Sequence, residues 1–555
     1  MYTRPNSGWE MLFFALFLGA CESEQAVEEL RAGEIKLTSP EPGAFLAEGS
    51  TAAKGRAAAL TGVSVNGVEA EVDAGSFTTD VNLERGVNVI EALGTDGHGD
   101  IHYARNGVLA GEFEAAEDEV ADAIHLRVNE GGLRKIGELA AEGLQPATLN
   151  SVLTAANPVY SDTYAWDTVT IAADVESVSF DAAQFDFTPR DGALALEVEI
   201  PNLYVDIYAY GDALGFGFDS DVAMWASSAV LRADVYAEAK RGRIAVEIGE
   251  VTVELLDFGY DTTLLPGSVE DYLLVDTIRA TLEEMLVAKI QEMVPPLLDE
   301  TLSGLDPSYS TELMGLTVEM AFSFAELEID DDGIALIMDM EINVPPSGIH
   351  SAPGYLGAKL GTPDVDTHAD LGGAVSDNLI NRMLYEAWQG GLLDMTLSTE
   401  DGSLSPLMLA PLKVTEGSIS VTALLPPVVV ERDGQLQAQI GELLVAIDAP
   451  GNALGDHLLV SVNAFAPLEV FAADGALTLK LGTPDVVLMV RESSAGGTDE
   501  STTALIEEVL PLDLLFSLIG DFSFPLPALY GIEIDEGSAS RDASGVYTAL
   551  EVSLN

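Results

Sequence analysis

Residues 269–305, VEDYLLVDTIRATLEEMLVAKIQEMVPPLLDETLSGL, decide the fold. Apolar side chains recur here every three or four positions, which predicts a long amphipathic helix with one buried stripe. Proline lacks a backbone donor and crowds the preceding turn, so the Pro295-Pro296 pair should end this helix and start a second short one. The stripe is formed by Leu274, Ile278, Leu282, Met285, Leu286, Ile290, Met293 and Val294, and it continues in Leu297, Leu298 and Leu302.

Three further segments show the same periodicity. The first follows Asn129, a candidate N-cap, and the second follows Ser376 or Asp377, either of which can cap a helix. The third spans 505–519. Their apolar positions are Leu133, Ile136, Leu139, Ala140 and Leu144; then Val375, Leu379, Ile380, Met383, Leu384, Ala387 and Trp388; then Leu505, Ile506, Val509, Leu514, Leu515, Leu518 and Ile519.

Strands with turn signals fill the intervals between these helices. Asp191-Gly192, Asp332-Gly333, Asp433-Gly434 and Asp474-Gly475 are each followed by an alternating strand, a pattern typical of hairpins. Each half of the segment 124–555 therefore has a helix near its start and another after its sheet. We expect an α+β fold in which two elongated antiparallel barrels wrap on amphipathic helices.

A smaller all-β unit precedes them. Residues 35–110 contain short alternating strands, and Asn66-Gly67 marks a tight hairpin. The pattern resembles the small immunoglobulin-like sandwich modules of bacterial surface proteins.

The amino terminus has the features of an export signal. The apolar run 11–18 is too short to span a membrane, and Leu18-Gly19-Ala20-Cys21 resembles a bacterial lipobox. Cys21 is the single cysteine, so we expect it to carry acyl chains that anchor the protein to a bacterial membrane; the alternative is an ordinary secretory signal with an unrelated cysteine. Residues 1–20 would then be the signal peptide and 21–34 an acidic tether.

Charge and composition exclude several classes of protein. The chain has 24 Lys and Arg against 92 Asp and Glu, a net charge of −68, which disfavours binding to nucleic acid. At 48% hydrophobic residues it is too apolar to be a disordered acidic tail. Such an acidic excess also suits a protein that works in high salt.

We find no pattern that predicts catalysis, a metal or a cofactor. The sequence lacks the G-x-S-x-G elbow, the P-loop and the G-x-G-x-x-G fingerprint, and it has only six histidines. Asp330-Asp331-Asp332-Gly333 lacks the ligand spacing of an EF-hand and fits a hairpin turn. We therefore expect a protein that is not an enzyme.

The order of elements from residue 124 to 555 resembles the tubular lipid-binding (TULIP) superfamily, which includes bactericidal/permeability-increasing protein, lipopolysaccharide-binding protein and cholesteryl ester transfer protein. The matching pieces are Glu130-Gly131-Gly132-Leu133, the helix at 269–305, the segment 374–397 and Phe524-Pro525-Leu526-Pro527. Two features depart from the family. One cysteine cannot form the disulfide of the mammalian relatives, and of the cationic tip only Lys240, Arg241 and Arg243 remain.

The resemblance implies lipid binding, with acyl chains held in apolar slots between helix and sheet. Lys240, Arg241 and Arg243 are weak candidates for headgroup contact and are otherwise a solvated turn. A neutral or zwitterionic lipid fits the acidic surface better than lipopolysaccharide does. The candidate slot residues are Leu133, Ile136, Leu139, Leu144, Leu282, Leu286, Ile290, Met293, Ile380, Met383, Leu384, Trp388, Leu505 and Val509, each of which has filled core as its alternative role.

The sequence thus predicts an extracytoplasmic, membrane-anchored protein that binds or transfers lipid, placed in the periplasm, at the outer membrane or at the cell surface. The alternative is an adhesion or structural lipoprotein with filled barrels, whose sandwich binds glycans or proteins. The expected domains are the sandwich at 35–110, a linker at 111–123, an N-terminal barrel at 124–308, a central sheet at 309–365 and a C-terminal barrel at 366–555.

Overall fold

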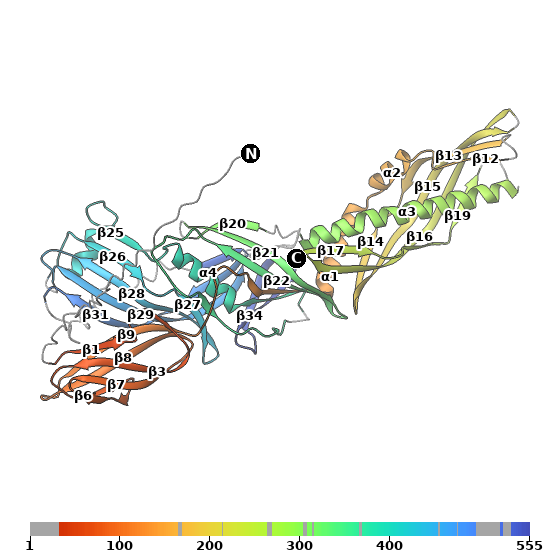
Figure 1. Ribbon diagram of the computed structural model, residues 1–555. Coiled ribbons are helices and arrows are strands. Elements are labelled where there is room, and N and C mark those ends of the chain that lie inside the picture. Colours follow the sequence, from red (N-terminus) through yellow and green to blue (C-terminus); the bar gives the residue numbers. More distant parts are fainter. Residues whose placement is uncertain are drawn as a thin grey trace, which may run out of the picture.

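A computed structural model shows an elongated, mostly β molecule with a helix-backed sheet at one end and two packed β units at the other (Figure 1). The structure describes residues 33–164, 169–213, 215–262, 269–303, 308–313, 316–365, 369–452, 455–473, 476–495, 522–525 and 534–554. Cys21, Leu505 and Val509 lie outside the described residues, as does most of the predicted signal and tether.

Residues 35–110 form two sheets that enclose a core of their own, which includes Ile35, Phe77 and Ile90. The predicted Asn66-Gly67 hairpin is confirmed, because Val65 pairs with Val68 and both turn residues have positive φ. The first sheet contains β1 (Ile35–Ser39), β3 (Gly49–Ala57), β7 (Ser76–Leu83) and β6 (Glu71–Asp73); the second contains β2 (Ala44–Leu46), β9 (Ile101–Ala110), β8 (Gly86–Asp96), β4 (Leu60–Val65) and β5 (Val68–Glu69).

The yellow and green end of Figure 1 is one curled antiparallel sheet with helix α3 along it. Alternating residues of its two longest strands, β15 and β16, are buried, as a sheet with one covered face requires. Its elements are α1 (Glu130–Gly143), α2 (Pro146–Ala155), β12 (Tyr160–Tyr164), β13 (Val169–Ser179), β14 (Gln184–Arg190), β15 (Ala193–Ala213), β16 (Phe216–Lys240), β17 (Arg243–Ile248), β18 (Thr252–Leu256), β19 (Gly259–Thr262) and α3 (Val269–Ser303).

The predicted break at Pro295-Pro296 is wrong, because α3 runs through both prolines. Val294 and Leu298, which flank the pair, are both fully buried. Two internal prolines cost a helix about 6 kcal/mol, whereas each buried residue of the stripe gains about 1.5–3 kcal/mol, and Leu282, Leu286, Ile290, Val294 and Leu298 are all buried. Burial of the stripe on both sides of the prolines therefore keeps the helix continuous.

The second curled sheet has 15 strands in the described residues and joins distant parts of the chain. β11 pairs with both β22 and β24, so the segment after the sandwich is built into the middle of this sheet. Its strands, in order, are β20 (Ser308–Leu313), β21 (Leu316–Ile329), β22 (Gly333–Asn343), β11 (Val120–Asn129), β24 (Leu371–Ser376), β34 (Tyr547–Leu554), β33 (Ile534–Arg541), β29 (His457–Ala473), β28 (Gln435–Asp448), β26 (Ser418–Ala423) and β25 (Met395–Ser398), with β27 (Val428–Arg432), β30 (Ala476–Leu481), β31 (Asp485–Ser493) and β32 (Phe522–Pro525) paired alongside.

In the described part of the chain, this sheet is accompanied by α4 (Asp377–Gln389) and the short 3-10 helix at Pro406–Leu412. The expected linker at 111–123 is ordered: it contains β10 (Glu112–Glu114), which pairs with β23 (Tyr355–Gly357), and the start of β11. Its backbone is held by strand pairing, which composition alone did not indicate.

A buried polar network fixes the sandwich to the second sheet. The side chain of Glu442 on β28 is fully buried and accepts hydrogen bonds from Arg491 at 2.8 and 2.9 Å and from Ser461 at 2.8 Å. It also accepts one from the backbone N–H of Gly107 in β9, and Arg491 donates to Asn106 beside it at 2.8 Å. The sandwich is therefore docked through a satisfied buried charge.

Candidate functional site

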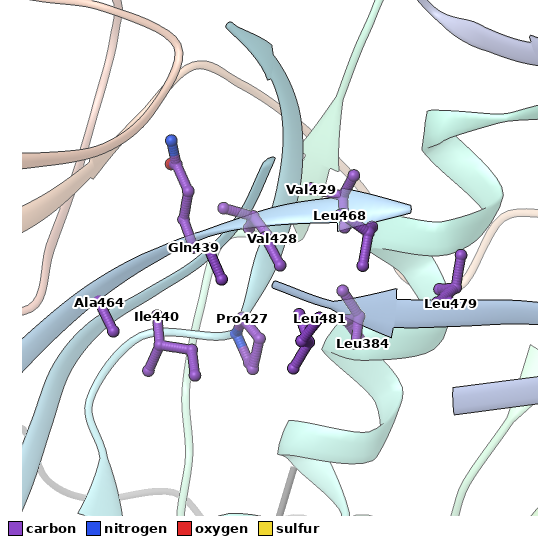
Figure 2. Close-up of a pocket in the computed structure, with 12 residues that line it drawn as sticks. Leu384, Pro427, Val428, Val429, Gln439, Ile440, Ala464, Leu468, Leu479 and Leu481 are labelled. Carbon is purple, nitrogen blue, oxygen red and sulfur yellow. The ribbon is translucent and has the colours of Figure 1, made fainter. Parts of the chain in front are cut away.

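An apolar pocket lies between α4 and the strands of the second sheet (Figure 2). Its empty space is about 480 Å³, part of which is open to solvent. The cavity proper is about 30 Å³, room for one or two water molecules, so an acyl chain has to part its walls to enter. Its lining consists of Leu384 from α4; Pro427, Val428 and Val429 at β27; Ala438, Gln439 and Ile440 on β28; Ala464, Ala466 and Leu468 on β29; and Leu479 and Leu481 on β30.

Small side chains open this space. Ala438 and Ala466 stand directly opposite each other on β28 and β29, and Ile440 faces Ala464 two residues along. Since opposing side chains on one face of an antiparallel pair are neighbours, these alanines leave room where larger residues would fill the core.

Polar contacts hold α4 at a fixed distance from the pocket wall. The amide of Asn381 accepts from the N–H of Val429 at 2.6 Å and donates to the carbonyls of Val429 and Leu356 at 3.0 and 3.1 Å. Of the two predicted cap candidates, Ser376 caps the helix by accepting from the N–H of Leu379 at 3.2 Å, and Asp377 is the first residue of the helix. The helix therefore keeps its position without contributing a polar group to the pocket lining.

The polar lining residue in the described part of the chain, Gln439, is satisfied from outside the pocket. Its Oε1 accepts from the N–H of Val87 in the sandwich at 2.7 Å, and its Nε2 donates to Gln437 at 2.8 Å. Figure 2 shows its amide pointing away from the apolar side chains. The described lining thus offers hydrocarbon contact without an unsatisfied polar group.

The charges on α4 are paired elsewhere. Asp377, fully buried, receives two hydrogen bonds from Arg541 at 2.8 and 2.9 Å, and Arg382 lies 3.0 Å from Glu386. Burial raises the pKa of the Asp377 and Glu386 carboxyls, and the arginines partly offset this. These pairs position the helix.

The structure places one predicted slot residue, Leu384, in this pocket. Ile380, Met383 and Trp388 are buried on the same helix, and Trp388 donates its indole N–H to the carbonyl of Ala423 at 2.8 Å. On α1 and α3 the structure buries Leu133, Ile136, Leu282, Leu286 and Ile290, and it half-buries Leu139 and Met293. Leu144, the C-cap of α1, is also buried.

The basic cluster does not lie at the free tip of the N-terminal sheet. Lys240, Arg241 and Arg243 surround the β16–β17 turn, and the carbonyl of Gly242 in that turn accepts from the N–H of Phe324 on β21 at 3.2 Å. The turn thus adjoins the second sheet, near the middle of the molecule. Lys240 is 2.7 Å from Glu238, so its charge is already paired.

The pocket wall on β27–β30 was not predicted. Its sequence signal is faint: an apolar run at 424–430 and alanines at alternate positions of one strand, Ala464 and Ala466. Alanine at every second position allows space beside a sheet, but only pairing with Ala438 on β28 creates it.

Within the described residues there is no cluster of His, Cys, Asp or Glu suited to hold a metal ion. In the same residues, no helix has the length and apolar character that a bilayer span requires.

The chain matches no protein-family model, and it matches no curated protein sequence. Among solved structures it is similar to the crystal structure of lipopolysaccharide binding protein, with 15% sequence identity and a TM-score of 0.42. The similarity covers 79% of this chain and 99% of that one.

Proposed function

We propose that this protein binds lipid, with an acyl chain entering the pocket between α4 and β27–β30. The observation that carries the proposal is the lining: apart from Gln439, whose amide is bonded outward, every described lining residue is apolar. Burial of hydrocarbon gains about 0.8 kcal/mol for each CH₂ group, so a chain of moderate length binds without any charged contact.

The surface favours a neutral or zwitterionic lipid. At a net charge of −68 the protein repels anionic headgroups, and the paired Lys240 offers them little compensation. We further propose that the protein is extracytoplasmic, anchored through acylated Cys21, and carries or transfers lipid without catalysing a reaction.

Lipid uptake by the purified chain tests the first proposal. Native mass spectrometry should detect co-purifying lipid, and a fluorescent fatty-acid analogue should bind. Ala466→Phe places a ring in the pocket and should reduce uptake at least tenfold, while thermal unfolding reports whether the fold survives.

Met293→Phe, on α3 and outside this pocket, is the matched control and should leave uptake unchanged. If Met293→Phe reduces uptake and Ala466→Phe does not, the lipid site lies at the N-terminal sheet and not in this pocket. Absence of both lipid and uptake in the unaltered protein would favour the adhesion or structural role.

The anchor needs a separate test, because it is independent of the pocket. Cys21→Ala should transfer the protein from the membrane fraction to the soluble fraction of the producing cells. Retention in the membrane fraction would refute the anchor without affecting the proposed pocket.

A further inference from the structure

Exposed aromatic side chains gather on one sheet of this protein. Six of the seven that are exposed in the described residues lie on β15, β16 and β19, and the seventh, Phe471, lies on β29. The six are Tyr204, Tyr210, Phe216, Trp225, Tyr236 and Tyr260. Strand register places Tyr204, Tyr210 and Trp225 on one outer face, whereas Tyr260 stands opposite the buried Met224 and lies on the other face. Large aromatic groups exposed together on one face indicate contact with a partner.

The outer face of this sheet has two adjacent rows of residues. In the first, Tyr204 on β15 is directly opposite Trp225 on β16, which is opposite Gly259 on β19. A Cβ atom added to Gly259 would lie 2.5 Å from the Trp225 ring, so the indole extends across the glycine and remains 40% exposed.

The second row places carboxylates on both sides of a small residue. Asp206 on β15 and Asp261 on β19 flank Ala223 on β16, and Asp221 stands opposite Tyr208 one row further. Ser177 donates to Asp206 at 2.7 Å, which orients that carboxylate. Adjacent strands are about 4.8 Å apart, so the gap over Ala223 is about two strand spacings wide. We call Tyr204, Asp206, Tyr208, Asp221, Trp225 and Asp261 the aromatic–acidic face.

Basic residues of this sheet leave the face unneutralised. β13, β15 and β19 contain no Lys or Arg, and the two on β16, Arg232 and Lys240, are paired with glutamates. Arg190 on β14 is opposite Ala193 and Arg243 on β17 is opposite Lys240, so both lie away from these rows. Accordingly, the negative charge of Asp206 raises the pKa of the Tyr204 hydroxyl, with a contribution from Asp261.

A contact elsewhere in this chain shows which cationic group binds next to an aromatic ring and a carboxylate. Arg105 in the sandwich lies 4.6 Å from the centre of the Tyr103 ring, and its Nε is 2.6 Å from Glu91. A guanidinium stacks on aromatic faces and forms paired hydrogen bonds with carboxylates, which an ammonium group cannot do as well.

We propose that the aromatic–acidic face binds an arginine-rich segment of a partner protein, with one guanidinium seated over Ala223 between Asp206 and Asp261 and stacked on Trp225. The partner must supply this cation, because the chain has only 24 basic residues and this face has none free in the described strands. The inference concerns a surface separate from the lipid pocket.

The probe is a fluorescent peptide with six Arg-Gly repeats, titrated with the full chain at about 0.3 M salt, where non-specific attraction is strongly screened. Trp225→Ala leaves the net charge unchanged, so only loss of the specific site weakens binding. We expect at least a tenfold loss for Trp225→Ala, partial retention for Trp225→Tyr, and no change for Phe471→Ala.

A charge-matched pair completes the test. Asp261→Asn should weaken binding several-fold, whereas Asp433→Asn, which removes the same charge at the β27–β28 turn, should not. Circular dichroism and uptake of the fatty-acid analogue report that each variant is folded. Equal binding by Trp225→Ala and the unaltered chain, or equal losses for the two Asn variants, would overturn the proposal, as would Trp225-dependent binding of maltohexaose or phosphatidylcholine vesicles in place of the peptide.

Discussion

Helices α3 and α4 are packed against sheets in opposite ways. α3 lies along its sheet, with the buried side chains Leu282, Leu286 and Ile290 on one stripe and exposed residues between them. α4 is buried at every position from Asp377 to Trp388, including its charged residues. The described stripe of the first helix is held by hydrocarbon burial, whereas the second helix also needs specific polar partners from distant strands.

This difference predicts which substitutions each helix tolerates. The effect of substituting a residue of α3 on stability should depend on whether the residue lies on the buried stripe, because its neighbours there are apolar. A polar residue of α4 matters according to its partner, since removing one member leaves the other buried and unpaired.

The largest effect is expected for Arg541→Ala. The carboxylate of Asp377 would remain buried without its partner, and we expect the free energy of unfolding to fall by about 3–5 kcal/mol, measured by urea denaturation. Lys240→Ala, which breaks the exposed pair with Glu238, is the control and should cost less than about 1 kcal/mol. Equal effects would contradict the claim that α4 depends on its buried ion pair.

Leu286→Ala tests the stripe of α3. Leu286 is fully buried, so its truncation leaves a cavity and should lower the free energy of unfolding by about 2–5 kcal/mol. Glu284→Ala, on the exposed side of the same helix, should change it by about 0.5 kcal/mol or less. A large effect of Glu284→Ala would show that α3, like α4, relies on polar contacts.

A smaller loss is expected for Asn381→Ala on α4. The N–H and carbonyl of Val429 would lose their partner in a buried setting, which should cost about 1–3 kcal/mol in thermal or urea unfolding. Asn343→Ala, an exposed asparagine bonded to Glu341, serves as the control and should be nearly neutral. An effect of Asn381→Ala no larger than that of the control would show that the amide does not fix α4.

The smallest effect is expected from His125 on β11, the strand between β22 and β24, which should make the stability of the protein depend on pH. Burial lowers the pKa of this imidazole, which packs edge-on against Tyr547, below the usual histidine value of 6.5. The unfolded chain therefore binds the proton more readily, and stability should fall as pH drops below about 6.5 toward the folded pKa. His125→Gln should reduce the change of the unfolding midpoint with pH in that interval. If the midpoint still changes with pH as in the unaltered protein, His125 is not the source of the dependence.

Local sequence signals predicted local structure well. The cap at Ser376, the hairpin at Asn66-Gly67 and the hairpin at Asp433-Gly434 all form, since each depends on residues within a few positions. Of the helical stripes, Leu133 and Ile136, Leu282, Leu286 and Ile290, and Ile380 and Trp388 are buried, whereas Leu139 and Met293 are half-buried.

Contacts between residues far apart in the sequence could not be predicted from these local patterns. The partner of Asp377 is 164 residues away at Arg541, and the alanines that open the pocket act through strand register. The continuity of α3 through Pro295 and Pro296 depends on what Val294 and Leu298 pack against, which periodicity alone does not weigh against a missing hydrogen bond.

The bonds around Glu442 have a mechanical consequence. Tension applied at the amino-terminal end of the sandwich passes from β9 at Asn106 and Gly107 to Arg491 and Glu442, and thus into β28. That strand also supplies Ala438 and Ile440 to the pocket. A protein held by its amino terminus would therefore transmit pulling forces to the wall of the apolar pocket.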